Sequence, residues 1–235
     1  ASVGEIAVVG DFAEEEIFEQ LGTVLNDWKS PAEYAHIPSE PHKIPGKLTE
    51  IIIPDKANAF YFAGLTFPMN SMSPEYPDLI VAGSVLGSSG LSSRLGDRVR
   101  QKEGLAYGVG AFIHADNVDP RGSISIYASC NPDNMEKVEV AIKEELELLI
   151  SKGITGEELA NAQKGYLEQQ EVSRTSDASL AGILTTNLFA DRDMTYYIDL
   201  EKKINAVTAE AAQKAFAKFI DPKDLIITVS GSLKK

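Results

Sequence analysis

The segment 122–130 constrains the fold most strongly, because apolar and polar side chains alternate along its whole length. Successive side chains of a strand point to opposite faces, so this pattern predicts a strand with one buried and one exposed face. Strands of this kind are typical of an antiparallel sheet that is covered by helices on one face only. The apolar face carries Ile124, Ile126, Ala128 and Cys130.

Other segments extend this prediction along the chain. Short apolar or alternating runs predict further strands at 6–10, 48–53, 58–66, 106–114 and 225–230. Helical spacing and capping residues predict helices at 17–28, 73–86, 91–99, 131–151, from 155 onward, and at 176–190, 195–205 and 208–220. The order of these elements predicts an α+β fold with a mainly antiparallel sheet and helices packed on one face.

The length of 235 residues favours a single domain that spans 1–235. The chain enters an apolar run at once and shows none of the features of a signal peptide, so we expect a fragment of a longer, multi-domain chain. The longest apolar stretch, Leu79–Leu86, is far shorter than the roughly 20 residues that cross a bilayer. No membrane-spanning segment is therefore predicted.

An excess of acidic residues limits the partners of the chain. The sequence has 35 Asp and Glu against 22 Lys and Arg, which gives a net charge of −13. Nucleic acids and anionic membranes both require clustered Lys and Arg, so neither is an expected partner. Three of the six arginines nevertheless lie between Arg94 and Arg100, in a short basic cluster.

The histidines offer one apparent metal site, which the sequence argues against. His36, Glu40 and His42 lie close together in the chain. Pro38 and Pro41 prevent a helix here, so the spacing of zinc-ligating histidines on a helix is not available. We interpret this segment as an exposed loop without a metal.

Four other candidates for chemistry have structural interpretations. Cys130, the single cysteine, excludes a disulfide framework and a thiolate metal site and is expected as a buried structural thiol. The glycine-rich segment 87–94 lacks the Gly-Lys-Ser/Thr ending of a phosphate-binding loop. The acidic pairs 144–145 and 157–158 fall on amphipathic helices and are interpreted as solvated faces. His114 ends a predicted strand and is expected at the surface.

Arg100 and Tyr107 are the strongest candidates for a functional site. At ~100° per residue, Arg100 lies about 140° from the centre of the apolar stripe Leu91, Leu95 and Val99, so it points away from the packing face. Tyr107 begins the next predicted strand after a glycine turn. A guanidinium and a phenol are both donors and neither is an effective general base at neutral pH. The pair suits binding of a peptide carbonyl or an oxyanion; a solvated arginine and a half-buried tyrosine are the structural alternative.

The segment from Leu91 to Tyr107, with the sequence LSSRLGDRVRQKEGLAY, resembles the signature of the second domain of the M16 metallopeptidases, the insulinase and pitrilysin type. Weaker similarities at 8–12, 155–164 and 204–210 extend the resemblance over nearly the whole chain. It implies an α+β M16 peptidase domain of the C-terminal, non-zinc kind. One departure is Gly108, where a larger polar residue is expected.

The resemblance also implies that two halves share the chemistry. The zinc site of the family uses H-x-x-E-H and a distant glutamate, and this chain, with three dispersed histidines, lacks that motif. Zn²⁺ is therefore expected in the partner domain and none in this chain. By resemblance, Arg100 and Tyr107 match the pair that the opposing half contributes to the peptide substrate and the tetrahedral intermediate.

The expected function is the non-zinc half of a zinc-dependent metallopeptidase, which cleaves no peptide by itself. Its H-x-x-E-H partner lies in the same full-length chain or in a companion subunit. Two alternatives stay open, a catalytically silent structural or assembly subunit of the M16 type and a small-molecule-binding α+β module. By analogy with exported multi-domain bacterial relatives, the periplasm is the favoured compartment and the cytoplasm is the alternative.

Overall fold

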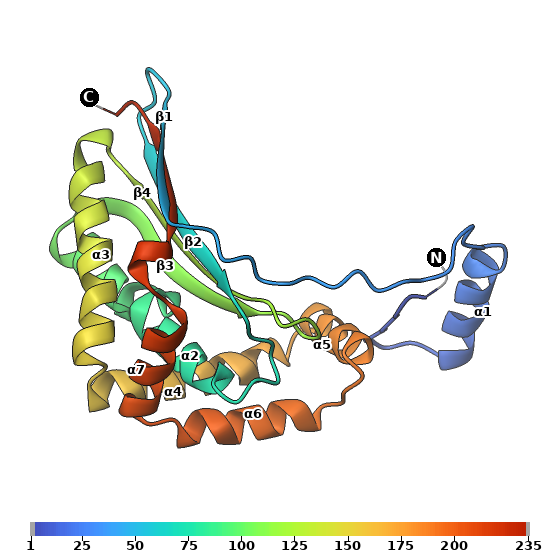
Figure 1. Ribbon diagram of the computed structural model, residues 1–235. Coiled ribbons are helices and arrows are strands. Elements are labelled where there is room, and N and C mark those ends of the chain that lie inside the picture. Colours follow the sequence, from blue (N-terminus) through green and yellow to red (C-terminus); the bar gives the residue numbers. More distant parts are fainter. Residues whose placement is uncertain (1–2, 234–235) are drawn as a thin grey trace. The chain divides into compact units, whose positions relative to one another are not determined.

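The computed structural model describes residues 3–233 and divides the chain into two compact units (Figure 1). The sheet unit comprises Ser39–Leu167 and Leu200–Lys235, and the smaller unit comprises Ala1–Pro38 and Glu168–Asp199. Two of the three divisions fall within helices, α4 (Gly156–Ser173) and α6 (Thr195–Ala206), and the third lies between Pro38 and Ser39 in an irregular segment. Arg100 and Tyr107 both belong to the sheet unit.

Five strands form one sheet in the sheet unit. They are β1 (Lys47–Ile52), β2 (Ala59–Phe67), β3 (Ala106–Ala115), β4 (Gly122–Cys130) and β5 (Ile226–Gly231). Their order is β1-β5-β2-β4-β3, in which β1 and β5 are parallel and every other neighbouring pair is antiparallel. The prediction of an α+β fold with a mainly antiparallel sheet is thereby confirmed.

The two faces of the sheet differ in burial, as the alternation in 122–130 predicts. On the inner face, Tyr61 and Ile126 are 2% and 1% exposed. On the outer face, Phe62 and Phe112 are 53% and 50% exposed, and Phe112 stacks on Tyr127 with 6.0 Å between ring centroids. The inner face therefore belongs to the core, and the outer face presents aromatic rings at the surface.

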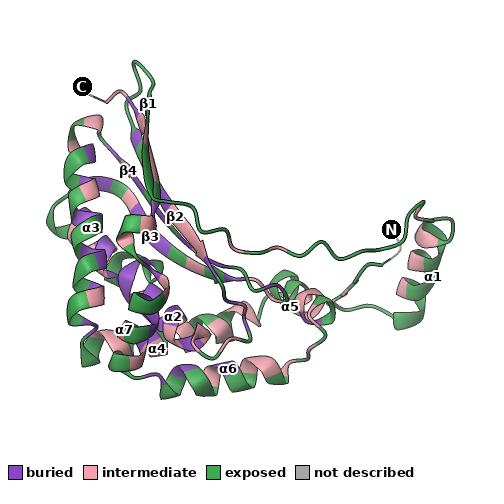
Figure 2. Ribbon diagram, viewed as in Figure 1, coloured by how far each residue is buried: buried purple, intermediate pink, exposed green. Residues whose placement is uncertain are grey.

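Helices cover the inner face of the sheet (Figure 1). They are α2 (Tyr76–Gly83), α3 (Met135–Lys152) and α7 (Ala209–Phe219). Figure 2 shows burial concentrated where these helices meet the sheet, and Ile142, Leu146 and Phe216 are at most 1% exposed there. Burying one such side chain contributes about 1.5–3 kcal/mol to stability. The short helical segments η4 (Pro132–Asn134) and η5 (Pro222–Asp224) precede α3 and β5.

The chain between α2 and β3 is helical but irregular. Its segments are the π-helix η1 (Ser84–Ser88), the 3₁₀-helix η2 (Gly90–Ser92) and the π-helix η3 (Gly96–Lys102). This irregularity makes part of the predicted apolar stripe wrong, because Leu91 is 47% exposed. Gly96 fits this path because a Cβ there would lie 2.1 Å from the carbonyl oxygen of Gly90. Short π-helical turns are rare and are frequent at functional sites.

The smaller unit is mainly helical. It contains α1 (Glu14–Leu25), α5 (Asp177–Phe189) and the adjoining parts of α4 and α6. The strand predicted at 6–10 is wrong, because these residues are irregular and pair with no strand within 3–233. A five-residue apolar run cannot form a strand without a neighbouring strand to bond its backbone. Across residues 3–233, no helix has both the length and the apolar character needed to cross a membrane.

Candidate functional site

Arg100 lies on η3, on the side opposite the residues that anchor this segment in the core. Leu95 and Val99 are completely buried, whereas Arg100 is exposed. No other residue within 3–233 forms a hydrogen bond or an ion pair with its guanidinium. Its five N–H donors are therefore available to a ligand. This position agrees with the helical-wheel prediction.

Tyr107 is the second residue of β3, which is an edge strand of the sheet. The pairing of β3 with β4 shifts between Ala106 and Gly108, so the ladder is irregular at this tyrosine. Bulges of this kind redirect side chains and are frequent next to active sites. Tyr107 is 61% exposed, and its phenol is therefore accessible from solvent.

One tight turn joins the two candidate residues. Gly104 within it has a φ of +61°, a left-handed conformation that glycine adopts at little cost. The amide of Leu105 donates to the carbonyl of Val99 at 2.8 Å. The carbonyl of Leu105 accepts from Nδ2 of Asn134 at 3.1 Å. These contacts fix the backbone of the turn and leave both candidate side chains at the surface.

The arrangement offers two hydrogen-bond donors of different kinds. Arg100 carries a permanent positive charge in a planar fork, and Tyr107 carries a neutral hydroxyl. Neither group accepts a proton readily at neutral pH, so the pair does not act as a general base. It can bind a carbonyl oxygen and stabilise negative charge that develops on that oxygen.

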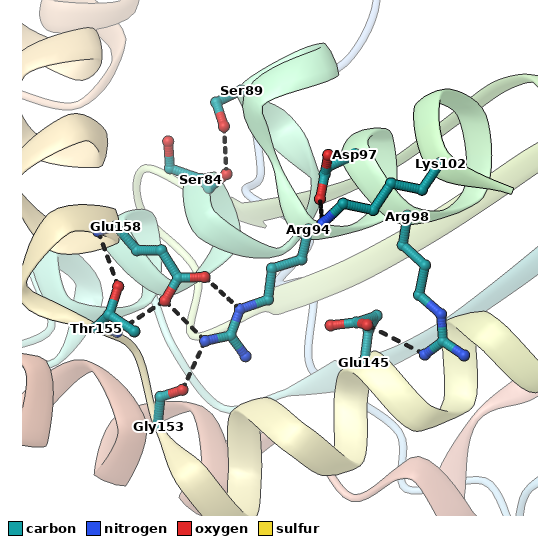
Figure 3. A network of polar contacts seen from close by, with 10 residues as sticks. All are labelled: Ser84, Ser89, Arg94, Asp97, Arg98, Lys102, Glu145, Gly153, Thr155 and Glu158. Carbon is teal, nitrogen blue, oxygen red and sulfur yellow. Dashed lines mark hydrogen bonds and ion pairs between the residues drawn. The ribbon is translucent and has the colours of Figure 1, made fainter.

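The other two arginines of the basic cluster, Arg94 and Arg98, are bound by carboxylates (Figure 3). Arg94 donates from Nε to Oε1 of Glu158 at 2.6 Å, and from Nη2 to Oε2 of Glu158 and to the carbonyl of Gly153, both at 2.8 Å. The amide of Thr155 also donates to Glu158 Oε2 at 2.7 Å, and Thr155 Oγ1 accepts from the Glu158 amide at 3.2 Å. These two reciprocal hydrogen bonds form a capping box at the start of α4, where the capping residues predict a helix from 155 onward.

Arg98 uses each nitrogen of its guanidinium for a different carboxylate. Nε donates to Glu103 at 2.8 Å, Nη1 donates to Glu145 at 3.1 Å, and Nη2 donates to Glu144. The hydrogen bonds to Glu103 and Glu144 raise the pKa of this guanidinium further above its ordinary value. The side chain of Glu145 is only 11% exposed.

These contacts correct the interpretation as solvated faces for Glu144, Glu145 and Glu158, whereas Glu157 is exposed as predicted. Glu145 and Glu158 bind arginines that lie 47 and 64 residues away in the sequence. No local spacing reveals a pair of that kind. The available signal was the density of arginine at 94–100 in a chain with net charge −13.

The histidines are placed apart from these residues. His36, His42 and His114 are all exposed, and the surface position predicted for His114 is confirmed. In the part of the chain that the structure describes, no three His, Cys, Asp and Glu side chains are grouped so that they could hold a metal ion. The side chains of the described residues therefore do not form a zinc centre of the kind that is expected in the partner half. The absence of zinc from this chain stays a prediction.

Two further features lie outside the candidate site. Cys130 is completely buried, as predicted, and burial raises the pKa of its thiol to about 11. A cleft of about 970 Å³ is lined by parts of β2, β4 and α7, but neither Arg100 nor Tyr107 lines it. In that cleft Lys43 pairs with Asp224 at 3.3 Å. Both candidate donors are exposed and lie outside this cleft.

Comparison with known protein families matches residues 5–166 to the peptidase M16 inactive domain. The match covers more than half of the chain and includes Arg100 and Tyr107. The chain belongs to this family. The resemblance of the segment 91–107 to the second M16 domain is thereby confirmed, and the chain is an inactive, C-terminal M16 domain.

Two bacterial relatives align with this M16 domain. The uncharacterized zinc protease YmxG of Bacillus subtilis is 37% identical over 108 residues, which are 45% of this chain and 26% of that protein. The non-peptidase homolog YmxG of Helicobacter pylori is 26% identical over 218 residues, which are 92% of this chain and 47% of that protein. One of these relatives is thus named as a protease and the other as a non-peptidase.

One solved structure supports the fold of the M16 domain over nearly its whole length. The peptidase M16 inactive domain from Pseudomonas fluorescens has a TM-score of 0.77 at 22% identity, over 97% of this chain and 54% of that chain. At this identity the likeness establishes the fold alone. The chain spans about half or less of the length of each of these relatives.

Proposed function

We propose that this M16 domain is the non-zinc half of a zinc-dependent metallopeptidase. In the complete enzyme, Arg100 and Tyr107 bind the peptide substrate and stabilise the tetrahedral intermediate of hydrolysis. The observation that carries this proposal is the joint exposure of two hydrogen-bond donors on one fixed turn, within the segment that the family match covers. Zinc and the general base belong to the H-x-x-E-H partner half.

The chemistry of peptide hydrolysis explains why such donors are useful. Attack on a peptide carbonyl converts its neutral oxygen into an oxyanion. Donors that already point at this oxygen stabilise the transition state more than the substrate, so they raise the rate. The fixed backbone between Val99 and Leu105 keeps the donors in place before the substrate arrives.

The outer face of the sheet supports the existence of a partner half. Phe60, Phe62 and Phe112 are 41%, 53% and 50% exposed there. Contiguous exposed apolar side chains mark interaction surfaces in soluble proteins. The relatives matched over most of this chain are about twice its length, which leaves room for a second domain of similar size.

A catalytically silent structural or assembly subunit is the second candidate. The name of the Helicobacter pylori relative, a non-peptidase homolog, favours it. The presence of both Arg100 and Tyr107 at the surface favours the catalytic half, because a purely structural subunit has no need of both donors.

Reconstitution from two halves distinguishes these candidates. The partner is first identified as an H-x-x-E-H sequence in the same reading frame or in an adjacent gene. The chain, the zinc half and their mixture are then each incubated with a mixed library of quenched fluorescent peptides. We expect cleavage by the mixture and little by either half alone. Full cleavage by the zinc half alone, or none by the zinc-loaded mixture, would favour the silent subunit.

A further inference from the structure

Arg98 connects the turn that carries the two candidate donors to helix α3. Its side chain is 25% exposed, and its Nε reaches Glu103 within the turn at 2.8 Å. Its Nη1 reaches Glu145 of α3 at 3.1 Å, and its Nη2 donates to Glu144 of α3. In Figure 3 the side chain of Arg98 extends from η3 toward Glu145 on α3. One guanidinium therefore holds the turn on one side and α3 on the other.

The backbone and the side chains close the turn at the same two residues. The amide of Glu103 donates to the carbonyl of Arg98 at 3.0 Å, and the side chains of these residues form the ion pair. Arg100 lies inside the loop that these contacts close, and Tyr107 follows four residues after Glu103. A displacement of this part of the turn would therefore change the direction of both donors.

We propose that Arg98 is a positioning residue for Arg100 and Tyr107. The proposal rests on the proposed function, because the direction of the two donors matters only if they meet a substrate. Arg98 is itself engaged by three carboxylates, so it acts through the turn and not on the substrate. A donor stabilises an oxyanion only near about 2.7–3.1 Å, and a misplacement of about 1 Å can reduce the rate roughly 10²-fold.

The contacts require an arginine at this position. A planar guanidinium presents donors in several fixed directions, whereas a lysine presents one compact ammonium on a flexible stem. Lysine at position 98 would therefore not serve Glu103 and the two α3 carboxylates together. Glu145, at 11% exposure, would be left as a largely buried charge with a weaker partner.

Arg94 provides a matched control in the same basic cluster. Its side chain is 16% exposed, and its planar fork also serves several acceptors, the two oxygens of Glu158 and the carbonyl of Gly153. These contacts join the helical segment to the ends of α3 and α4, and none of them involves the turn between 100 and 107. Substituting lysine removes a comparable fork at either arginine, but only Arg98→Lys disturbs the turn.

Amide hydrogen exchange tests the positioning role without any enzymatic assay. In the full-length protein, Arg98→Lys and Glu103→Gln should speed exchange of the amides at residues 103 and 105 by about tenfold or more, because local opening becomes easier. In Arg94→Lys the rates at these two amides should stay within about twofold of the wild type. Glu103 is 41% exposed in its side chain, so its substitution is not expected to impair folding.

Kinetics of the complete peptidase supply the second measurement. The probe is one quenched fluorescent peptide, chosen from a mixed library because the wild-type enzyme cleaves it. Arg98→Lys should lower kcat by roughly 10- to 100-fold and Glu103→Gln by about tenfold, with KM within about threefold. Arg94→Lys should keep kcat within about twofold at temperatures below its Tm, even where that Tm is lower.

The outcomes separate failure of this role from failure of the proposed function. The positioning role alone would be overturned if Arg98→Lys and Glu103→Gln kept the wild-type kcat while Tyr107→Phe lowered it. An equal loss of kcat in Arg98→Lys and Arg94→Lys that follows their Tm would also overturn it, because the network would then be purely structural. Full activity of Tyr107→Phe and Arg100→Lys would overturn the proposed function, and the positioning role with it.

Discussion

Arg94 and Glu158 are joined by two parallel hydrogen bonds, from Nε to Oε1 at 2.6 Å and from Nη2 to Oε2 at 2.8 Å. The pair ties the start of the helical segment that leads to Arg100 to the first turn of α4. Because the same guanidinium also binds the carbonyl of Gly153, which ends α3, one side chain joins three helical elements. These contacts therefore hold the helical segment, α3 and α4 together at a point outside the turn between 100 and 107.

Glu158→Gln keeps the shape of this side chain and removes its charge. The hydrogen bond from Arg94 lowers the pKa of Glu158 to about 2 in the folded protein, from an ordinary value of 4.5. A pKa that folding lowers stabilises the protein above the ordinary value, and that contribution is lost as the pH falls toward the folded value. We expect the wild type to be more stable by about 1–3 kcal/mol at neutral pH. The difference should shrink between about pH 5 and pH 2.

Urea unfolding followed by circular dichroism at several pH values measures this difference. Glu157→Gln, the neighbouring exposed carboxylate, is the matched control and should change stability little at any pH. A stability difference for Glu158→Gln that does not vary with pH would contradict the ion pair as its cause.

Cys130 should be unreactive in the native protein. Its side chain is completely buried, and burial raises the pKa of the thiol to about 11, so almost no thiolate forms at pH 8. We expect negligible reaction with Ellman's reagent under native conditions and reaction of one thiol per chain after unfolding in guanidinium chloride. Fast labelling of the native protein would mean that β4 opens readily.

The sequence predicted the elements whose signal is local. β2 and β4 follow from runs of alternating or apolar residues, and α3 follows from an amphipathic repeat behind an Asn-Pro-Asp cap. The parallel pair of β1 and β5 has no such signal, because its two strands come from segments more than 170 residues apart in the chain. The apolar run at 6–10 imitates a strand, but strand formation depends on a partner that a local pattern does not reveal.

The candidate site was predictable only where its signal is local in the sequence. The exposure of Arg100 followed from the helical period near the buried Leu95 and Val99. The exposure of Leu91 did not, because the 3₁₀ and π turns around it break the regular period of 3.6 residues. The two α3 carboxylates that bind Arg98, Glu144 and Glu145, were not predictable, because they lie 46 and 47 residues further along the chain.

The purified chain should bind no stoichiometric zinc. Structural and catalytic zinc sites need three or four well-placed side chains, and none of the groups within residues 3–233 meets that condition. Metal analysis by mass spectrometry after dialysis against metal-free buffer should show far less than one zinc per chain. About one tightly held zinc per chain would mean that the chain has a site of its own.

Arg100→Lys keeps the positive charge at the candidate site and removes the planar fork. Because an ammonium cannot reproduce the paired N–H donors of a guanidinium, we expect a clear loss of kcat/KM in the complete enzyme. The free energy of unfolding should change by no more than about 1 kcal/mol, since Arg100 is exposed and no other residue within 3–233 bonds to it. Peptide hydrolysis and thermal melting, measured on the same preparation, test both statements.

Tyr107→Phe removes one hydroxyl donor and keeps the aromatic ring. If this hydroxyl stabilises the developing oxyanion, kcat/KM of the complete enzyme should fall by roughly 10²–10³, the usual effect of losing one oxyanion donor. Tyr107 is 61% exposed, so the free energy of unfolding should change by no more than about 1 kcal/mol. Tyr127→Phe, the same change on the outer face of β4, is the matched control and should leave hydrolysis unaltered. Full activity of Tyr107→Phe, or a loss that merely follows the Tm, would reduce the pair to a surface arginine and a packing tyrosine.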